Sequence, residues 1–130
     1  MEIKFEGGKK VNAVINGRVL KTDQPLNAGG EGSAPTPFEL FLASIGTCAG
    51  IYVKGFCDQR GINTDNIHIQ QQMEWDPVRQ IMGKIHIEIS VPVDFPEKYE
   101  SAMVNAANLC TVKRHLKEDL DIKVFATRRS

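Results

Sequence analysis

The sequence predicts an α+β fold in a single domain, residues 1–130, in which an antiparallel sheet accompanies a long buried central helix. Two stretches, Ile67–Trp75 and Ile81–Val93, alternate apolar and polar residues with the period of two that half-buried strands show. Residues 36–61 are apolar on nearly every side of a helix, which is typical of a buried one. A chain of 130 residues, 42% of them hydrophobic and 25% charged, suits one globular core.

The N-terminal third is expected to hold short strands joined by tight turns. Residues 6–9 form a turn between Ile3–Phe5 and Val11–Ile15. Asn16-Gly17 is the strongest hairpin signal in the chain, because a type I′ turn needs positive φ at both central residues, and it would pair Val11–Ile15 with Arg18–Thr22. The Gly-rich stretch 27–35 lacks the Gly-Lys-Ser/Thr ending of a phosphate-binding loop, so we interpret it as a flexible connector.

The central helix is predicted to begin after Thr36 and to run to Arg60. Thr36 and Glu39 have the spacing of a capping box, and Gly61 supplies a left-handed stop. Three glycines lie inside this helix: Gly46, Gly50 and Gly55. A glycine inside a helix weakens it by about 1 kcal/mol relative to alanine and usually lets another element approach closely. We therefore expect another element to pack tightly on this helix.

Three further elements are expected after the two long strands. A second helix opens at Pro96, and four of its residues share one face: Tyr99, Met103, Ala106 and Cys110. Thr111 can cap a short helix that runs to Leu120. The alternation in Asp121–Thr127 predicts a last strand.

Composition excludes several classes of partner. The 16 basic residues balance 16 acidic ones, whereas nucleic acids and anionic lipid surfaces select basic proteins. No basic segment followed by an apolar one opens the chain, and no apolar run reaches the roughly 18–20 residues of a membrane span. We therefore expect a cytoplasmic protein with no nucleic-acid or membrane partner, whose cysteines stay reduced.

The three cysteines are the residues best suited to chemistry. Cys48 lies twelve residues after Thr36, too far along the helix for its dipole to lower the thiol pKa, so a reactive Cys48 needs a cationic side chain from elsewhere. Cys57 lies nine residues further, at 900° or half a turn away, so the two cannot bond within this helix. Cys110 precedes a basic stretch near a helix start, a setting that favours a thiolate. The alternative for each is a small buried hydrophobe.

No metal or cofactor is expected. The spacings Cys48/Cys57 and Cys110/His115 match no zinc pattern, and the two groups lie far apart in the sequence. His68 and His86 alternate with apolar residues of the two long strands, so we interpret them as surface residues on the polar side of the hairpin.

Two segments resemble the signatures of a known family. Residues 35–48, from Pro35 to Cys48, resemble the first signature of the OsmC/Ohr family of osmotically inducible and organic hydroperoxide resistance proteins. Residues 108–112, which include Cys110, resemble the second signature, which is usually Cys-Pro-Val. The order of the predicted elements also fits, so the resemblance covers nearly the whole chain. It implies an OsmC-like intertwined homodimer in which the two long helices pack centrally.

The resemblance also implies an activity. Family members reduce organic hydroperoxides with a cysteine pair, so Cys48 would be the peroxidatic thiol and Cys110 the resolving thiol, with an external dithiol as reductant. Arg18 and Glu39 are the candidates to support the Cys48 thiolate. The substrate pocket would be apolar, at the dimer interface, and lined by aromatic residues of the long helix: Phe38, Phe41 and Tyr52.

One departure from the family pattern leaves the activity open. The glutamate that supports the thiolate normally follows the proline directly, where this chain has Phe38, and Glu39 is rotated from that position by about 100°. One alternative is therefore a small-molecule-binding or redox-sensing protein with little peroxidase turnover. A second is a structural dimer module whose cysteines only pack.

Overall fold

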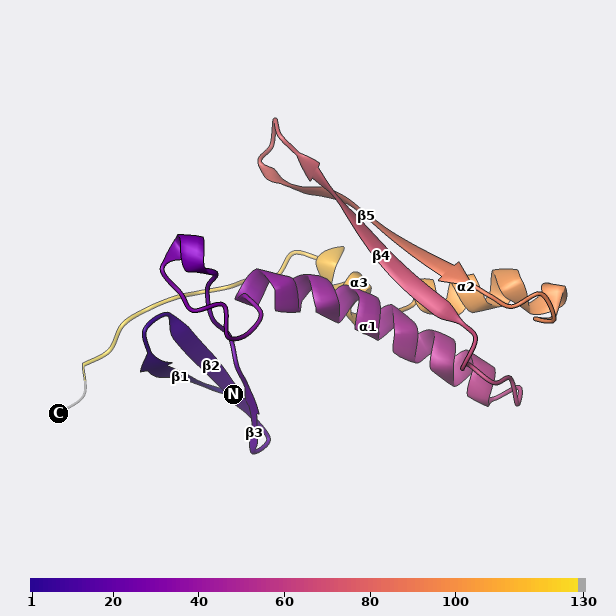
Figure 1. Ribbon diagram of the computed structural model, residues 1–130, viewed down its shortest axis with the longest axis horizontal. Helices are drawn as coiled ribbons and strands as arrows, with labels where there is room; N and C mark the ends of the chain where they lie inside the picture. Colours follow the sequence, from indigo (N-terminus) through magenta and orange to yellow (C-terminus); the bar gives the residue numbers. More distant parts are fainter. Residues whose placement is uncertain (129–130) are drawn as a thin grey trace. The chain divides into compact units, whose positions relative to one another are not determined.

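The computed structural model describes residues 1–128 and divides the chain into two compact units, residues 1–44 and 45–130. The boundary falls inside the long helix α1, Pro37–Asp58. Antiparallel strands and helices follow one another in the predicted order up to residue 116 (Figure 1). The structure thus confirms the α+β class.

The first unit contains a three-stranded antiparallel sheet. Its strands β1 (Glu2–Gly7), β2 (Lys10–Ile15) and β3 (Arg18–Leu20) lie in the order β1-β2-β3. Asn16 and Gly17 have φ angles of 50° and 76°, which confirms the predicted turn with positive φ at both central residues. A short 3₁₀ turn, η1 (Leu26–Ala28), follows the sheet.

A buried carboxylate organises the loop after β3. Asp23 is 0% exposed and accepts hydrogen bonds from the backbone N–H groups of Gln24 at 2.7 Å, Ser33 at 3.0 Å and Glu31 at 3.3 Å. The Ser33 hydroxyl donates a fourth bond at 2.6 Å. Bonds to its charged form, those of Ser33 first, lower the pKa of Asp23 to about 2. The stretch predicted as a flexible connector is thus tied down by one side chain.

The capping box of α1 forms as predicted. The Glu39 N–H donates to Thr36 Oγ1 at 3.2 Å, and the Thr36 N–H donates to Glu39 Oε2 at 2.7 Å. The helix ends at Asp58, two residues before the predicted end. Gly61 then adopts a φ of 65°, and the Ile62 N–H donates to the Cys57 carbonyl at 2.9 Å, which satisfies one of the last carbonyls of the helix.

A long antiparallel hairpin forms the sheet of the second unit. Strand β4 (His68–Asp76) pairs with β5 (Ile81–Ser90), close to the predicted bounds. Ile69 pairs with Ile89 on one face, and the exposed Gln70 pairs with Glu88 on the other. A bulge interrupts the register between Glu74 and Trp75, and beyond it the Trp75 side chain is 54% exposed.

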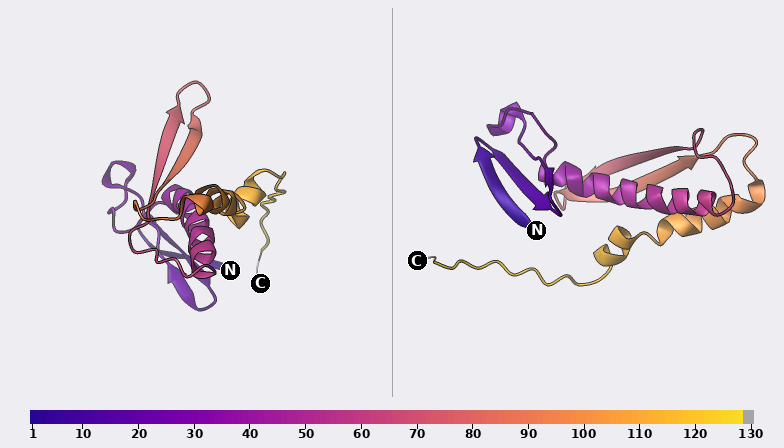
Figure 2. Two further views of the ribbon diagram at one scale, coloured as in Figure 1. Left: turned by 90° about the vertical axis from the view of Figure 1, so that its right-hand side faces the viewer. Right: turned by 90° about the horizontal axis from the view of Figure 1, so that it is seen from below.

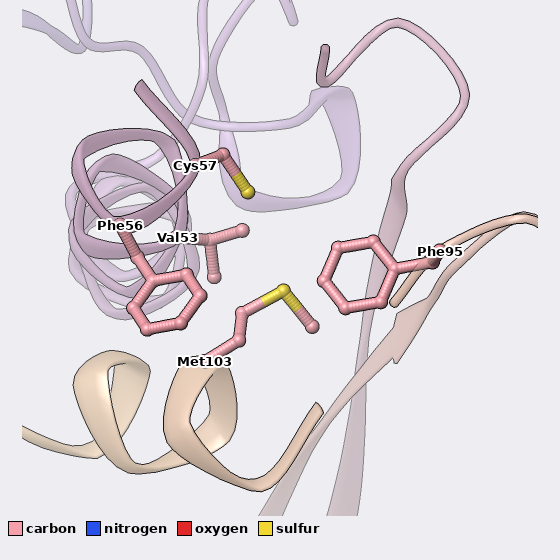
Figure 3. Packing of buried hydrophobic residues seen from close by; sticks show 5 residues of the cluster. All are labelled: Val53, Phe56, Cys57, Phe95 and Met103. Carbon is pink, nitrogen blue, oxygen red and sulfur yellow. The ribbon is translucent and has the colours of Figure 1, made fainter. Parts of the chain in front are cut away.

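The core of the second unit lies between α1, the hairpin and α2 (Glu100–Asn108), which follows a 3₁₀ turn, η2 (Glu97–Tyr99). In Figure 3 side chains from the two helices point toward one another and toward the aromatic ring of the segment after β5. The cluster consists of Val53, Phe56, Cys57, Phe95 and Met103. Of the four residues predicted to share a face of this helix, Met103 and Ala106 lie within α2, whereas Tyr99 is its N-cap and Cys110 is the N-cap of α3.

The predicted last strand is absent from the described residues. Helix α3 (Thr111–Leu116) is followed by a segment, visible in Figure 2, in which residues 121–128 form no strand. Its alternating apolar side chains are exposed: Ile122 is 75% and Val124 is 94% accessible. A strand needs a hydrogen-bonded neighbour, and among the described residues no strand pairs with this segment.

Helix α1 buries one face, although the sequence predicts a helix buried all round. Leu42, Ile45, Ala49 and Val53 are buried, whereas Ile51 is 62% exposed. By length and composition alone α1 could cross a membrane, since its mean hydropathy is 1.5 over a window of which 33% is buried. The sequence expectation concerned an uninterrupted apolar run of about 18–20 residues, and α1 holds none, because Glu39 and Lys54 bound a shorter uncharged stretch.

Candidate functional site

An apolar cleft of about 370 Å³ lies within the second unit, and the helices carrying Cys48 and Cys110 both contribute to its walls. One wall is the apolar face of β5, and the others come from α1, α2 and α3. The lining residues are Ile45, Ala49, Ile85, Ile87, Ile89, Val104, Ala107, Asn108, Cys110, Lys113 and Leu116.

Cys110 lines this cleft and is 1% exposed as a residue. It is the N-cap of α3, and its Sγ accepts a hydrogen bond from the Lys113 backbone N–H at 3.2 Å. The sequence assigned the cap to Thr111, which instead is the first residue of the helix.

Cys48 lies on the same side of α1 as the cleft. Its position falls at −60° from Ile45 on a helical wheel and Ala49 falls at +40°, so the three residues share one face. Ile45 and Ala49 are buried and line the cleft, whereas Cys48 is partly exposed and is not among the lining residues. Both cysteines are free thiols in this structure. Cys48 is the more exposed of the two thiols, as suits a nucleophile that meets its substrate first.

Tyr52 connects the two cysteine-bearing segments. It lies four residues after Cys48, one turn further along α1, and its hydroxyl is 3.1 Å from Thr111 Oγ1. Thr111 directly follows Cys110. The side chain of Tyr52 does not line the apolar cleft and instead borders a neighbouring groove of about 350 Å³ between α1 and α2.

Lys113 is the one charged side chain among the described residues that line the cleft. Its Nζ donates to Asn108 Oδ1 at 2.5 Å, and Asn108 Nδ2 donates to the Val104 carbonyl at 3.2 Å. The polar groups of the cleft thus lie near Cys110, opposite the isoleucines of β5. Sequence reasoning did not assign these isoleucines to a pocket, although their alternation along β5 marks the apolar face that forms the wall.

Cys57 has a purely apolar setting. It is 0% exposed and packs in the core cluster with Val53 and Met103. Burial raises the pKa of its thiol, because the charged thiolate loses its hydration. These surroundings agree with the packing role that the sequence suggested and make Cys57 a useful reference thiol.

The other candidate residues lie in the first unit. Arg18 is exposed at the start of β3. Glu39 is engaged in the capping box. Phe38 and Phe41 stack on each other with ring centroids 5.7 Å apart, and they are 48% and 40% exposed. The roles of Arg18 and Glu39 beside Cys48, and the pocket role of the two phenylalanines, stay predictions.

The described residues contain no group of three or more His, Cys, Asp or Glu side chains that could hold a metal ion. His68 and His86 are exposed on the polar face of the hairpin. The candidate site thus combines an apolar cleft, the Cys110 thiol and the Lys113 ammonium group that line it, and Cys48 on the stretch of α1 between the lining residues Ile45 and Ala49.

The model of the OsmC-like protein family matches residues 30–125, which include both cysteine segments. The chain belongs to the OsmC-like protein family. A comparison with curated proteins finds no match.

Solved structures share the fold of this OsmC-like chain at low sequence identity. A putative osmotic stress induced and detoxification response protein from Psychrobacter arcticus is similar at a TM-score of 0.74 and 18% identity, over 88% of this chain and 85% of that one. A hypothetical protein from Aquifex aeolicus is similar at 0.62 and 21% identity, over 89% and 84%. An organic hydroperoxide resistance protein OsmC from Legionella pneumophila, described as a predicted redox protein, is similar at 0.52 and 19% identity, over 94% and 92%.

Proposed function

We propose that this OsmC-like protein is a cytoplasmic thiol peroxidase that reduces organic hydroperoxides to alcohols. The observation that carries the proposal is the placement of the two signature cysteines. Cys110 lines an apolar cleft, to which Ile45 and Ala49, three residues before and one residue after Cys48 on α1, also contribute. The apolar walls suit the organic part of a hydroperoxide, which burial transfers out of water.

The proposed reaction needs two thiols and an external dithiol. The Cys48 thiolate attacks the outer oxygen of the peroxide, the O–O bond breaks, and the alkoxide leaves and takes up a proton to become the alcohol. Cys48 is then a sulfenic acid. The Cys110 thiolate attacks its sulfur, forms the disulfide and releases hydroxide. An external dithiol reduces the disulfide by exchange and leaves as its own disulfide.

The proposed assembly is a homodimer, as the family resemblance implies. The outer apolar face of α1 supports it, because Ile51 is 62% exposed in the single chain. So do the exposed apolar residues of the first sheet, such as Phe5 at 88%. Large exposed apolar side chains of this kind are typical of surfaces that another chain covers. Arg18, which we propose to hold the Cys48 thiolate, would act within this assembly.

The test is dithiol-dependent reduction of cumene hydroperoxide, with hydrogen peroxide as the comparison substrate. The variants are Cys48→Ser, Cys110→Ser and, as the matched control, Cys57→Ala. Serine is a favoured N-cap, so Cys110→Ser keeps the start of α3 while it removes the thiol. We expect no turnover for Cys48→Ser, one oxidation without turnover for Cys110→Ser, and wild-type rates for Cys57→Ala. A wild type no faster than Cys48→Ser would refute the peroxidase.

A second function is favoured by one observation. Phe38 stands where peroxidatic members have glutamate, and Glu39 is hydrogen-bonded to the Thr36 N–H. A chain without that carboxylate beside the thiolate would serve as a binding or redox-sensing protein with little turnover. The variant Phe38→Glu separates the two, because it raises the rate at least about tenfold if the missing carboxylate limits catalysis.

A further inference from the structure

The contact between Tyr52 and Thr111 joins two elements that each carry one of the signature cysteines. The Tyr52 Oη and Thr111 Oγ1 atoms are 3.1 Å apart, the distance of a hydrogen bond between hydroxyl groups. Tyr52 belongs to α1, and Thr111 is the first residue of α3. The two residues are 59 positions apart in the sequence, so the bond fixes tertiary structure and not a local turn.

The Tyr52 end of this bond is close to Cys48. Residues four apart on a helix have Cβ atoms about 5–6 Å from each other, and long side chains lean toward the turn that precedes them. From this geometry we expect the ring of Tyr52 to lean toward the turn of α1 that carries Cys48. The lining of the cleft agrees with this placement, since Ala49, the residue after Cys48, lines the same cleft as Cys110.

The Thr111 end of the bond is covalently next to Cys110. Thr111 is the first residue of α3. Proline is common at this position of a helix because its ring fixes the backbone there, whereas threonine leaves the backbone free. In this chain the side chain of Thr111 is restrained from outside, by the hydroxyl of Tyr52. The turn that holds Cys110 is therefore anchored to the face of α1 that holds Cys48.

We propose that Tyr52 is a positioning residue, which holds the Cys110 turn beside Cys48 through its hydrogen bond to Thr111 and so promotes closure of the Cys48–Cys110 disulfide. The inference rests on the proposed function for its role in turnover. A disulfide requires Cα atoms about 4.4–6.8 Å apart and the correct direction of both side chains, so a small drift of the α3 start slows closure. Tyr52 does not react in any step.

Closure can be measured without a peroxide. Diamide oxidises the two thiols directly: they lose two electrons and two protons, which its N=N bond takes up to form the hydrazine, and the S–S bond forms. The variants are Tyr52→Phe and Thr111→Val, which each remove one hydroxyl, and their double variant. Thr111→Ser keeps the hydroxyl, and Tyr99→Phe is the control at a tyrosine whose ring packs against Phe56.

We expect Tyr52→Phe and Thr111→Val each to slow closure about threefold to tenfold, the range that one hydrogen bond of modest net strength supports. The double variant should be no slower than the slower single variant, because both remove the same bond. Thr111→Ser and Tyr99→Phe should close at the wild-type rate. The readouts are free-thiol titration and peptide mapping of the 48–110 disulfide, with thermal unfolding as a check on stability.

Three outcomes would overturn the inference: wild-type closure rates in both single variants, additive slowing in the double variant, or no 48–110 disulfide in the wild type. A failure of the proposed peroxidase activity is told apart from a failure of the positioning role in the Cys110→Ser background. There, a sulfenic acid at Cys48 is trapped after addition of cumene hydroperoxide. Thr111→Val, at a residue that does not line the cleft, should leave that trapping rate unchanged. If no sulfenic acid forms while diamide closure still depends on Tyr52, the peroxidase fails and the positioning role stands.

Discussion

The two units of the chain bury different kinds of side chain. Among the described residues of the first unit, the buried ones are Asn12, Thr22, Asp23 and Leu42, three of them polar. In the second unit they are apolar throughout: Ile45, Ala49, Val53, Phe56, Cys57, Phe95, Met103 and Cys110. The first unit is held by directional bonds to a buried carboxylate and the second by close packing. The stability that hydrogen bonds to a charged group provide depends on pH, whereas the stability that packing provides depends on the volume of the buried side chains.

Shortening a side chain in the packed core tests the second half of this comparison and should have the largest effect. Met103→Ala removes a 2%-exposed side chain from the cluster in Figure 3 and should lower the free energy of unfolding by about 2–5 kcal/mol. Val93→Ala is the control, because Val93 is fully exposed and should change stability by less than about 0.5 kcal/mol. Urea unfolding followed by circular dichroism measures both. Equal losses in the two variants would mean that the cluster does not hold this unit.

Neutralising the buried carboxylate tests the first half. The pKa of Asp23 is about 2 in the folded protein, below its value of about 3.9 in an unfolded chain, so its charge stabilises the fold above pH ~4. That stabilisation is lost as the pH falls toward 2. Asp23→Asn should therefore speed amide hydrogen exchange in residues 24–33 about tenfold at pH 5, and less at pH 2.5.

The control for this experiment is the exposed Asp94→Asn, and exchange is followed peptide by peptide. Peptides of the second unit, such as residues 100–108, should exchange alike in all three proteins. A loop that exchanges at the same rate with and without the Asp23 charge would contradict the comparison.

Substitution of two glycines on opposite sides of α1 should have a smaller effect on stability. A Cβ at Gly55 would meet no atom within 4 Å, so Gly55→Ala should stabilise the protein by about 0.5–1 kcal/mol. A Cβ at Gly46 would lie 2.5 Å from Gln71 Oε1 on β4, so Gly46→Ala should lose that gain. Thermal unfolding ranks the two variants. A destabilising Gly55→Ala would indicate that a second chain covers that side of the helix.

Local signals in the sequence were enough for most of the fold. Asn16-Gly17, the Thr36–Glu39 pair and the alternation in the two long strands each depend on neighbouring residues, and the structure confirms all three. Asp121–Thr127 carries the alternation of a strand, but pairing depends on a distant edge that a local pattern does not encode. The order around Asp23 was also missed, because its four donors come from residues up to ten positions away.

The candidate site shows the same division. The cysteines were found from their family signatures, and Cys110 was correctly placed at a helix start. The wall of β5 and the link from Tyr52 to Thr111 depend on how α1, the hairpin and α3 pack, which spacing along the chain does not reveal. The sequence predicted Thr111 as the N-cap of α3, and the structure has Cys110 there. This shift of one residue places the thiol itself against a backbone N–H.

The bulge beside Trp75 has a consequence for spectroscopy. The chain contains one tryptophan, and its side chain is 54% exposed next to the tip of the β4–β5 hairpin. Intrinsic fluorescence of this protein is therefore a reporter of the hairpin tip. A shift of its emission on dimerisation would mark the tip as part of the contact surface.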